Sequence, residues 1–196
     1  MTKISAPPDV GIQHHAGQHE WGNWLRLHHE NSPGVWLRIA KKGSGLTSVS
    51  YLEALETALC FGWIDGQKKK LDEHAWLQRF SPRRSRSIWS KANCTKAQAL
   101  FEQGRMQPAG LKEMELAKED GRWENAYDSA STMTMPHDLQ QALDAEPGAA
   151  AFFATLDSAN RYAVLWRVQT AKKAETRAKR IRQFVEMLAR REKIHP

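Results

Sequence analysis

The sequence has only two cysteines, Cys60 and Cys94, and it has no long hydrophobic run. Two cysteines are too few for the disulfide framework that stabilises small secreted proteins. A membrane-spanning helix needs roughly 18 or more consecutive apolar residues, and residues 1–17 lack the apolar stretch of a secretory signal. We therefore expect a cytoplasmic protein with no transmembrane segment and with both thiols reduced.

Motifs for the common catalytic and cofactor chemistries are also missing. There is no GxxxxGK[ST] phosphate loop, no GxGxxG after a strand, no HExxH or CxxC and no GxSxG. Cys60 lies beside Leu59 and Phe61 on the apolar side of an expected helix, which favours a buried structural thiol over a nucleophile. We predict no cofactor, no metal and no catalytic residue, an interpretation that leans away from an enzyme.

The composition is that of a globular protein with a basic surface. The chain has 196 residues, of which 41% are hydrophobic and eight are Trp, so it is long enough to bury a core without disulfides or a metal. Its net charge of +7 is concentrated in two segments. Residues 66–96 contain nine Lys/Arg and two Asp/Glu, residues 171–196 contain nine and three, and the remainder is acidic. Such clustering is compatible with polyanion binding.

The order of periodic segments predicts an α+β fold, with a small antiparallel sheet and flanking helices followed by a helical C-terminal part. Residues 19–29 have helical spacing, and residues 35–40 are rich in strand-forming side chains. Ser50 and Glu53 fit a capping box, and residues 63–71 and 74–80 fit a hairpin. We predict a flexible arm over residues 1–17, an α+β domain over 18–130, and a helical module over 131–196 that packs on it.

Two later helix boundaries are predicted by similar signals. Thr95 and Gln98 fit a second capping box, which places a helix start at Thr95. Residues 175–191 have an apolar stripe at alternating steps of four and three, which indicates a terminal amphipathic helix.

The segment from Arg79 to Asn93 is the most unusual in the chain, because it combines four arginines with hydroxyl groups and an indole. Guanidinium groups bind phosphate or carboxylate in pairs of hydrogen bonds, and an indole can stack on a ring. One interpretation is therefore an anion or polar-ligand site. The other is that these arginines pair with acids of the helical half. The candidate ligand-binding residues are Trp63, Asp65, Arg79, Arg83, Arg86, Ser87, Trp89 and Asn93.

A second candidate surface is basic and is distributed over both charged segments. It is compatible with contact to nucleic acid or an anionic membrane, although a solvated helix face is the simpler interpretation of the terminal residues. Its residues are Lys68, Lys69, Lys70, Arg84, Lys172, Lys173, Arg177, Lys179, Arg180 and Arg182.

An ordered series of short motifs carries a family resemblance over most of the chain from Trp21 to Pro196. In the first part the motifs are Glu53–Leu55, Ala58–Gly66, Arg79–Arg83 and Ser87–Ser90. Further along they are Gly104–Gly110, Ala117–Lys118, Gly121–Trp123, Ala126–Tyr127, Ala171–Lys173, Glu175–Arg177 and Arg180–Ile181. These motifs resemble the YdeI/OmpD-associated family, also called bacteriocin-protection proteins.

The resemblance implies a function in protection against bacteriocins or cationic peptides and an association with an outer-membrane porin. It brings no catalytic residues and no cofactor. We therefore expect a non-enzymatic binding or stress-resistance protein with an Arg-rich anion-recognition surface, whose partner is an unidentified anionic ligand or protein. The alternatives are a nucleic-acid-binding protein and an enzyme with a pocket near Trp63, Asp65 and Arg79.

Overall fold

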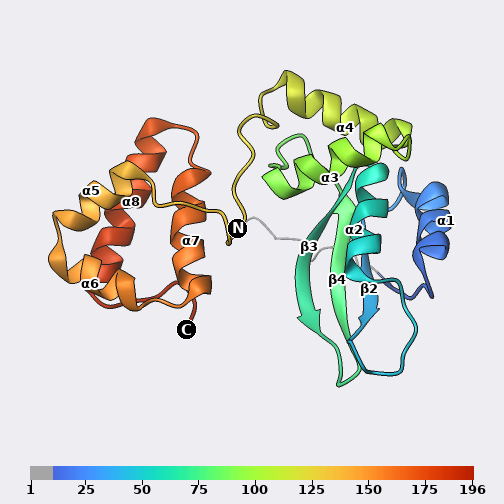
Figure 1. The fold of residues 1–196 in the computed structure, drawn as a ribbon, viewed down its shortest axis with the longest axis horizontal. Coiled ribbons are helices and arrows are strands. Elements are labelled where there is room, and N and C mark those ends of the chain that lie inside the picture. Colours follow the sequence, from blue (N-terminus) through green and yellow to red (C-terminus); the bar gives the residue numbers. More distant parts are fainter. Residues whose placement is uncertain (1–10) are drawn as a thin grey trace, which may run out of the picture. The chain divides into compact units, whose positions relative to one another are not determined.

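The computed structural model describes residues 11–196 and divides the chain into two compact units (Figure 1). Unit 1 consists of the described residues up to Trp89 together with Asn93–Asn125, and unit 2 consists of Ser90–Ala92 and Ala126–Pro196. Most of the arm predicted for residues 1–17 lies outside the described residues. The packing of the helical module on the first domain stays a prediction.

Unit 1 contains a four-stranded sheet with the order β1-β2-β4-β3. β2 pairs with β4, and β4 with β3, in antiparallel fashion, whereas β1 pairs with β2 in parallel. The α+β class is confirmed, but the prediction of an antiparallel sheet is wrong, because the sheet is mixed. The strands are β1 (Ile12–Gln13), β2 (Val35–Ala40), β3 (Trp63–Lys70) and β4 (Ala75–Pro82).

β1 lies in the stretch that the sequence analysis assigned to the arm. Two residues are too short to show a strand periodicity, so the pattern of side chains carries no signal for this strand. The backbone hydrogen bonds that hold the stretch are from the Trp36 amide to the Gly11 carbonyl (3.3 Å) and from the Val49 amide to the His15 carbonyl (2.9 Å). Both depend on partners far along the chain.

An aromatic core fixes helices α1 (Gln18–His28) and α2 (Tyr51–Cys60) to the sheet. The Trp21 ring of α1 is fully buried, lies 5.7 Å from the Phe80 ring of β4, and donates its indole N–H to the Ala54 carbonyl of α2 at 3.1 Å. The predicted capping box at the start of α2 is confirmed: the Ser50 hydroxyl accepts from the Glu53 amide, and the Glu53 carboxylate accepts from the Ser50 amide. Large aromatic side chains thus dominate the burial in this unit.

The predicted β3–β4 hairpin is confirmed, with an irregularity in β3 between Asp65 and Lys68. Its turn is closed by Asp72, whose Oδ1 accepts from the amides of His74 (2.8 Å) and Ala75 (2.7 Å). β3 is an edge strand, and its outer half is exposed and carries the three consecutive lysines. Charged residues on an edge strand discourage pairing with a further strand.

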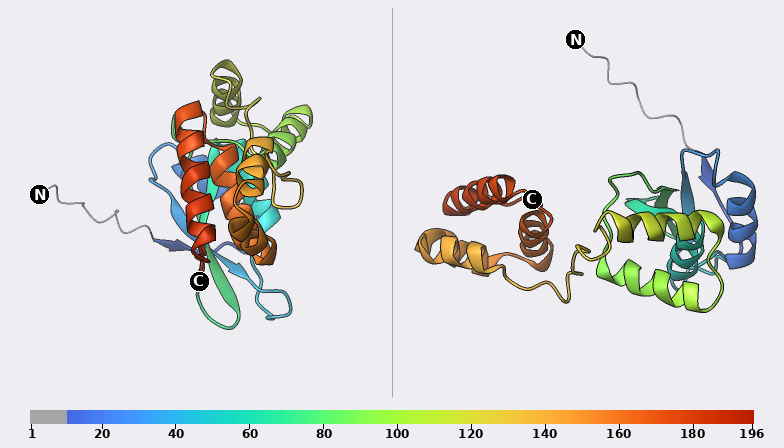
Figure 2. Two further views of the ribbon diagram at one scale, coloured as in Figure 1. Left: turned by 90° about the vertical axis from the view of Figure 1, so that its left-hand side faces the viewer. Right: turned by 90° about the horizontal axis from the view of Figure 1, so that it is seen from above.

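Helices α3 (Lys91–Glu102) and α4 (Pro108–Glu119) lie at one end of the sheet (Figures 1 and 2). The predicted helix start at Thr95 is wrong, because α3 begins four residues earlier. Asn93, Ala97 and Leu100 are buried at helical spacing, so tertiary packing on this face extends the helix past the local capping signal. Pro108 occupies the first turn of α4, as expected for a helix start.

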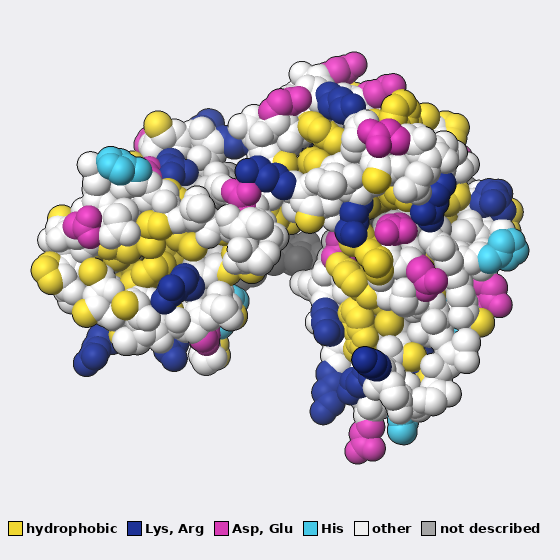
Figure 3. Space-filling model, viewed as in Figure 1, with side chains coloured by type: hydrophobic (Ala, Val, Ile, Leu, Met, Phe, Trp, Pro, Cys, Tyr) yellow, Lys and Arg dark blue, Asp and Glu magenta, His cyan; other side chains and the backbone are white. Residues whose placement is uncertain are grey.

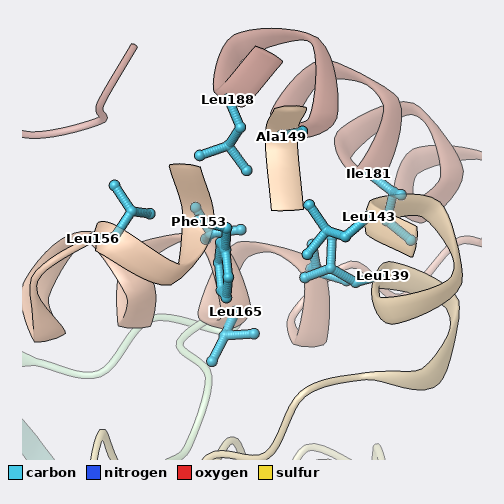
Figure 4. Packing of buried hydrophobic residues seen from close by; sticks show 10 residues of the cluster. Leu139, Leu143, Ala149, Phe153, Leu156, Leu165, Ile181 and Leu188 are labelled. Carbon is cyan, nitrogen blue, oxygen red and sulfur yellow. The ribbon is translucent and has the colours of Figure 1, made fainter. Parts of the chain in front are cut away.

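Unit 2 consists mainly of four helices around their own hydrophobic core (Figure 4). An ion pair also links two of these helices. Arg177 donates to both carboxylate oxygens of Asp138, at 2.5 and 2.8 Å. No helix among residues 11–196 is both long enough and apolar enough to span a membrane. The helices are α5 (His137–Asp144), α6 (Pro147–Thr155), α7 (Ser158–Gln169) and α8 (Ala174–Ala189).

Candidate functional site

A cleft in unit 1 lies where the ends of several helices and strands meet. Its volume is about 690 Å³, which is within the range of small-molecule sites. It is bounded by the C-terminal end of α1, the α2–β3 junction, the end of β4 and the first turns of α4. The lining residues are Arg26, His29, Glu30, Phe61, Gly62, Trp63, Pro82, Arg83, Gln107, Pro108, Ala109, Lys112 and Glu113.

Gly62 allows the chain to turn from α2 into β3 at the floor of this cleft. Its φ of +72° is in the left-handed region that favours glycine, and its amide donates to the Leu59 carbonyl at the end of α2. A Cβ here would lie 2.9 Å from the Ala109 carbonyl oxygen. Because glycine has no side chain, α4 can approach Gly62 closely and close one side of the cleft.

Trp63 follows directly and forms part of the cleft wall. Only 1% of its surface is exposed, and its indole N–H donates to the His29 carbonyl at 3.1 Å. Its ring meets those of Trp21 and Trp24 edge-on. Because these contacts hold the buried indole rigidly, Trp63 supports the cleft wall from within the core.

Arg83 also lines the cleft, but its guanidinium is buried: Nη1 donates to the Ile88 carbonyl at 3.3 Å, and Nε and Nη2 are hidden from solvent. The residue is 7% exposed, its amide donates to the Gly62 carbonyl at 3.0 Å, and its guanidinium lies 3.5 Å from the ring centroid of Trp89. Stacking on the indole holds the planar guanidinium in place. The Arg83–Trp89 loop is further held by Arg122, which donates to the Ser87 carbonyl at 3.0 Å. The charge is thus positioned by the fold.

The cleft contains groups of both charges. Arg26, Arg83 and Lys112 are basic, and Glu30 and Glu113 are acidic. The Glu113 Oε2 atom is buried, and no donor among residues 11–196 is within hydrogen-bond distance of it. A buried acceptor without a partner is costly, so this oxygen is a ready partner for a donor on a bound molecule.

Neither cysteine of the sequence lines this cleft. Burial raises the pKa of the Cys60 thiol to about 11, and likewise that of Cys94, so both are thiols at neutral pH. Among the described residues there is no group of three or more His, Cys, Asp or Glu that could hold a metal ion.

Of the predicted ligand-binding residues, Trp63 and Arg83 line the cleft. The Trp89 ring stacks against the Arg83 guanidinium. Arg79 is directed elsewhere: its guanidinium donates to the carbonyls of Pro33 (3.0 Å) and Phe80 (3.3 Å). The Asp65 carboxylate accepts from the Tyr51 hydroxyl at 2.7 Å. Both side chains thus link segments of unit 1 that are separate in the sequence.

The other predicted positions are distributed around the loop. The Ser87 hydroxyl accepts from the Arg84 amide at 2.9 Å and closes the loop. Arg84 and Arg86 are exposed, whereas Asn93 is buried in α3. The eight predicted residues thus do not form one site.

The cleft residues on α1 and α4 were missed by the sequence analysis. His29, Lys112 and Glu113 have ordinary helical surroundings, and no spacing in the sequence connects α1 with α4. The available signal was indirect: Gly62 and Pro108 mark the two chain turns that meet at the cleft.

The basic residues of the second candidate surface separate into two groups. Lys68, Lys69 and Lys70 are exposed on β3 of unit 1. In unit 2, Arg177 is held by Asp138, and Arg180 donates to the Arg167 carbonyl, so both have internal partners. The exposed basic residues of this set in unit 2 are Lys172, Lys173, Lys179 and Arg182.

The fold is that of an α+β protein with a cleft of small-molecule size in its first unit and a separate helical unit. Residues 13–113, more than half of the chain, match the model of a domain of unknown function, DUF8412, and the chain belongs to this family. Residues 132–191 match the model described as Bacteriocin-protection, YdeI or OmpD-Associated, which confirms the resemblance to that family.

The two matches cover most motifs of the resemblance. Those between Glu53 and Gly110 fall within the first match, those between Ala171 and Ile181 within the second, and those between Ala117 and Tyr127 within neither. No curated protein and no solved structure matches the chain.

Proposed function

We propose that the protein is a non-enzymatic binding protein whose unit 1 holds a small anionic ligand with a flat apolar part in the Trp63–Arg83 cleft. The observation that carries this proposal is a cleft of about 690 Å³ whose lining combines the exposed cations Arg26 and Lys112 with Phe61, Pro82 and Pro108. The buried Arg83 guanidinium, stacked on Trp89, adds a fixed positive charge to this wall. Because the fold already holds this charge and the apolar lining in place, less ordering is needed on binding.

The surrounding charges specify the ligand further. Arg26 and Lys112 are exposed cations at the cleft and are the partners we assign to a carboxylate, sulfonate or phosphate group. The buried Glu113 Oε2 would accept a hydrogen bond from an amino or hydroxyl group of the ligand. We therefore assign the cleft to a compact metabolite-like molecule that carries an anionic group and a ring. The family matched by residues 132–191 supports a context of bacteriocin protection or stress resistance for this binding.

Calorimetric titration with naphthalene-1-sulfonate tests this assignment, with 2-naphthylmethanol and methanesulfonate as probes that lack the anion or the ring. We expect saturable 1:1 binding of the sulfonate, and about tenfold weaker binding of each partial probe, because one charge-assisted hydrogen bond contributes about 1.5–3 kcal/mol. Equal binding of 2-naphthylmethanol would remove the anion from the proposal. Absence of saturable sulfonate binding would overturn it.

Two variants locate the binding without disturbing the core. Lys112→Ala removes an exposed cation of the cleft, and Lys118→Ala removes an exposed cation from the same helix outside the cleft. We expect Lys112→Ala to weaken sulfonate binding about threefold to tenfold, since the group is partly solvated. Lys118→Ala should leave the affinity unchanged. A similar loss in both variants would indicate a general charge effect and contradict a site in the cleft.

A further inference from the structure

A second concave surface in unit 1 lies at the hairpin end of the sheet and does not depend on the cleft. It has a volume of about 430 Å³, and we call it the lysine groove. In Figure 3 basic side chains gather at this end of the sheet, on the side of β3. The residues of the lysine groove are Ala40, Lys41, Lys42, Lys68, Lys70 and Trp76.

The sheet order explains why these lysines lie on both sides of the Trp76 ring. β4 lies between β2 and β3, so Trp76 is central. Lys41 and Lys42 directly follow β2 on one side of the groove. Lys70 lies on β3, on the other side, and is the direct cross-strand partner of Trp76. The Lys68 ammonium lies 4.2 Å from the centroid of the Trp76 ring. Four lysine charges therefore surround one half-buried indole.

Among residues 11–196, no lysine of the groove forms an ion pair with an acid. Asp72 directs its carboxylate to the amides of the hairpin turn, and the Lys41 ammonium reaches only the Asp72 carbonyl oxygen, at 2.9 Å. None of the lysine-groove residues is an acid. Lys69, on the other face of β3, lies 4.3 Å from the Trp36 ring and extends the positive charge around the sheet edge. An excess of unpaired cations in a concave surface attracts a polyanion.

We propose that the lysine groove binds the phosphate backbone of a single-stranded nucleic acid, with Trp76 as the surface on which an unstacked base is held. Basic grooves with an aromatic floor suit single strands, whose bases are free to stack, whereas a duplex conceals its base faces. The outermost residues of the hairpin turn are Asp72 and Glu73, which would meet an anionic membrane before the lysines do. This placement favours a strand that runs along the groove over a lipid surface.

Fluorescence anisotropy with a labelled oligo(dT) about 15 nucleotides long tests the proposal on the full-length protein. We expect binding that weakens steeply between about 50 and 200 mM salt, because each phosphate contact releases counterions. Lys68→Ala/Lys70→Ala should bind about tenfold more weakly at the lowest salt and have a log–log salt slope shallower by about 1.4. Lys172→Ala/Lys173→Ala, which removes the same charge from unit 2, should bind as the wild type does.

Trp76→Leu separates stacking from charge. We expect a loss of about fivefold or more in oligonucleotide affinity with the salt slope unchanged, since stacking of one base contributes about 1–3 kcal/mol. The far-UV circular dichroism and melting temperature of each variant verify that it is folded. If Trp76→Leu does not fold, the lysine variants alone decide the question.

Three results would overturn the proposal. The first is no oligo(dT) binding at the lowest salt. The second is an equal loss in the Lys172→Ala/Lys173→Ala control, which would make the effect one of net charge. The third is binding to phosphatidylserine-containing vesicles with no binding to the oligonucleotide, which would assign the groove to a membrane surface.

Discussion

Two glycines allow main-chain segments to approach one another beneath the cleft. Gly62 adopts a left-handed conformation, and Gly110 of α4 packs directly on the end of α2, where a Cβ would lie 2.2 Å from the Cys60 carbonyl oxygen. Because backbone atoms of α2 and α4 cannot move independently of their helices, this contact fixes the distance between the two helices. It thereby positions Lys112 and Glu113 at the cleft.

Gly110→Ala therefore has a predictable effect with an internal control. Alanine is favoured over glycine in a helix, but here the added methyl group would push α4 away from Cys60, so we expect a destabilisation of about 1–3 kcal/mol. Gly22→Ala in α1 places its methyl group 3.6 Å from Thr57 Cγ2, an ordinary contact, and should stabilise by about 0.5–1 kcal/mol. Urea unfolding of both variants measures the difference. Stabilisation by Gly110→Ala would contradict the close approach of α2 and α4.

Two of the residues that line the cleft, Trp63 and Arg83, are predictable from the sequence, whereas the lining residues on α1 and α4 are not. Trp63 and Arg83 were predicted because their neighbourhood is rich in unusual residues. Arg79 and Asp65 were grouped with them, yet their side chains bind Pro33 and Tyr51 instead. A local cluster in sequence does not specify which face of a strand each side chain occupies when the strand contains an irregularity, as β3 does between Asp65 and Lys68.

The elements of unit 2 are joined by an ion pair between α5 and α8. Arg177 of α8 donates two hydrogen bonds to Asp138 of α5 and a third to the Val168 carbonyl of α7 at 2.9 Å. The hydrogen bonds from Arg177 hold the pKa of the Asp138 carboxyl below its usual range. One side chain thus connects three helices, and its charge is used within the unit.

This ion pair predicts a pH dependence. The ionised Asp138 is stabilised only in the folded state, so its contribution is present above the unfolded pKa of about 3.9 and is lost as the pH falls through the lower folded pKa. Asp138→Asn should lower the free energy of unfolding by about 0.5–1 kcal/mol at pH 7, a modest value because the pair is partly exposed. The difference from the wild type should shrink below pH 4.

Chemical denaturation at a series of pH values measures this difference. Glu192→Gln, which removes the partner of Arg190 in an exposed pair near the C-terminus, is the matched control and should leave stability unchanged at each pH. A constant difference between Asp138→Asn and the wild type from pH 7 to pH 3 would contradict the ionic origin of the effect.

Helix and strand positions were predictable where local signals agree with packing. The strand over residues 35–40 and the Ser50–Glu53 capping box are both present as predicted. At Thr95 the capping pattern is present in the sequence, but buried Asn93 continues the helix face upstream. β1 depends on pairing with β2 and has no local signal. The errors thus arise where tertiary contacts decide the structure.

At the scale of the molecule, the chain contains two separately cored units. The core of unit 2 is formed by residues between Leu139 and Leu188, with additional packing from residues such as Met133 and Ile194. The two family matches follow the same division, because 13–113 lies almost entirely in unit 1 and 132–191 lies in unit 2. Each unit has the burial that an independently folding domain requires.

A fragment of residues 126–196 should therefore fold by itself. It lacks Lys91, whose ammonium lies 2.7 Å from Asp128, but it retains the whole core cluster. We expect helical circular dichroism and a cooperative thermal transition. In the same fragment, Leu188→Ala should cost about 2–5 kcal/mol, because Leu188 is fully buried. A fragment without a cooperative transition would show that unit 2 depends on unit 1.

The indole resonance of Trp63 gives the sharpest test of the proposed binding. The proposal is that unit 1 binds a small anionic ring-containing molecule in the Trp63–Arg83 cleft. The Trp63 indole N–H donates to the His29 carbonyl in the cleft wall and gives a separate signal in a ¹H–¹⁵N correlation spectrum. Titration with naphthalene-1-sulfonate should shift this signal with the calorimetric midpoint, while the indole signals of Trp36 and Trp76 stay in place. A stationary Trp63 signal at saturating probe would contradict the claim.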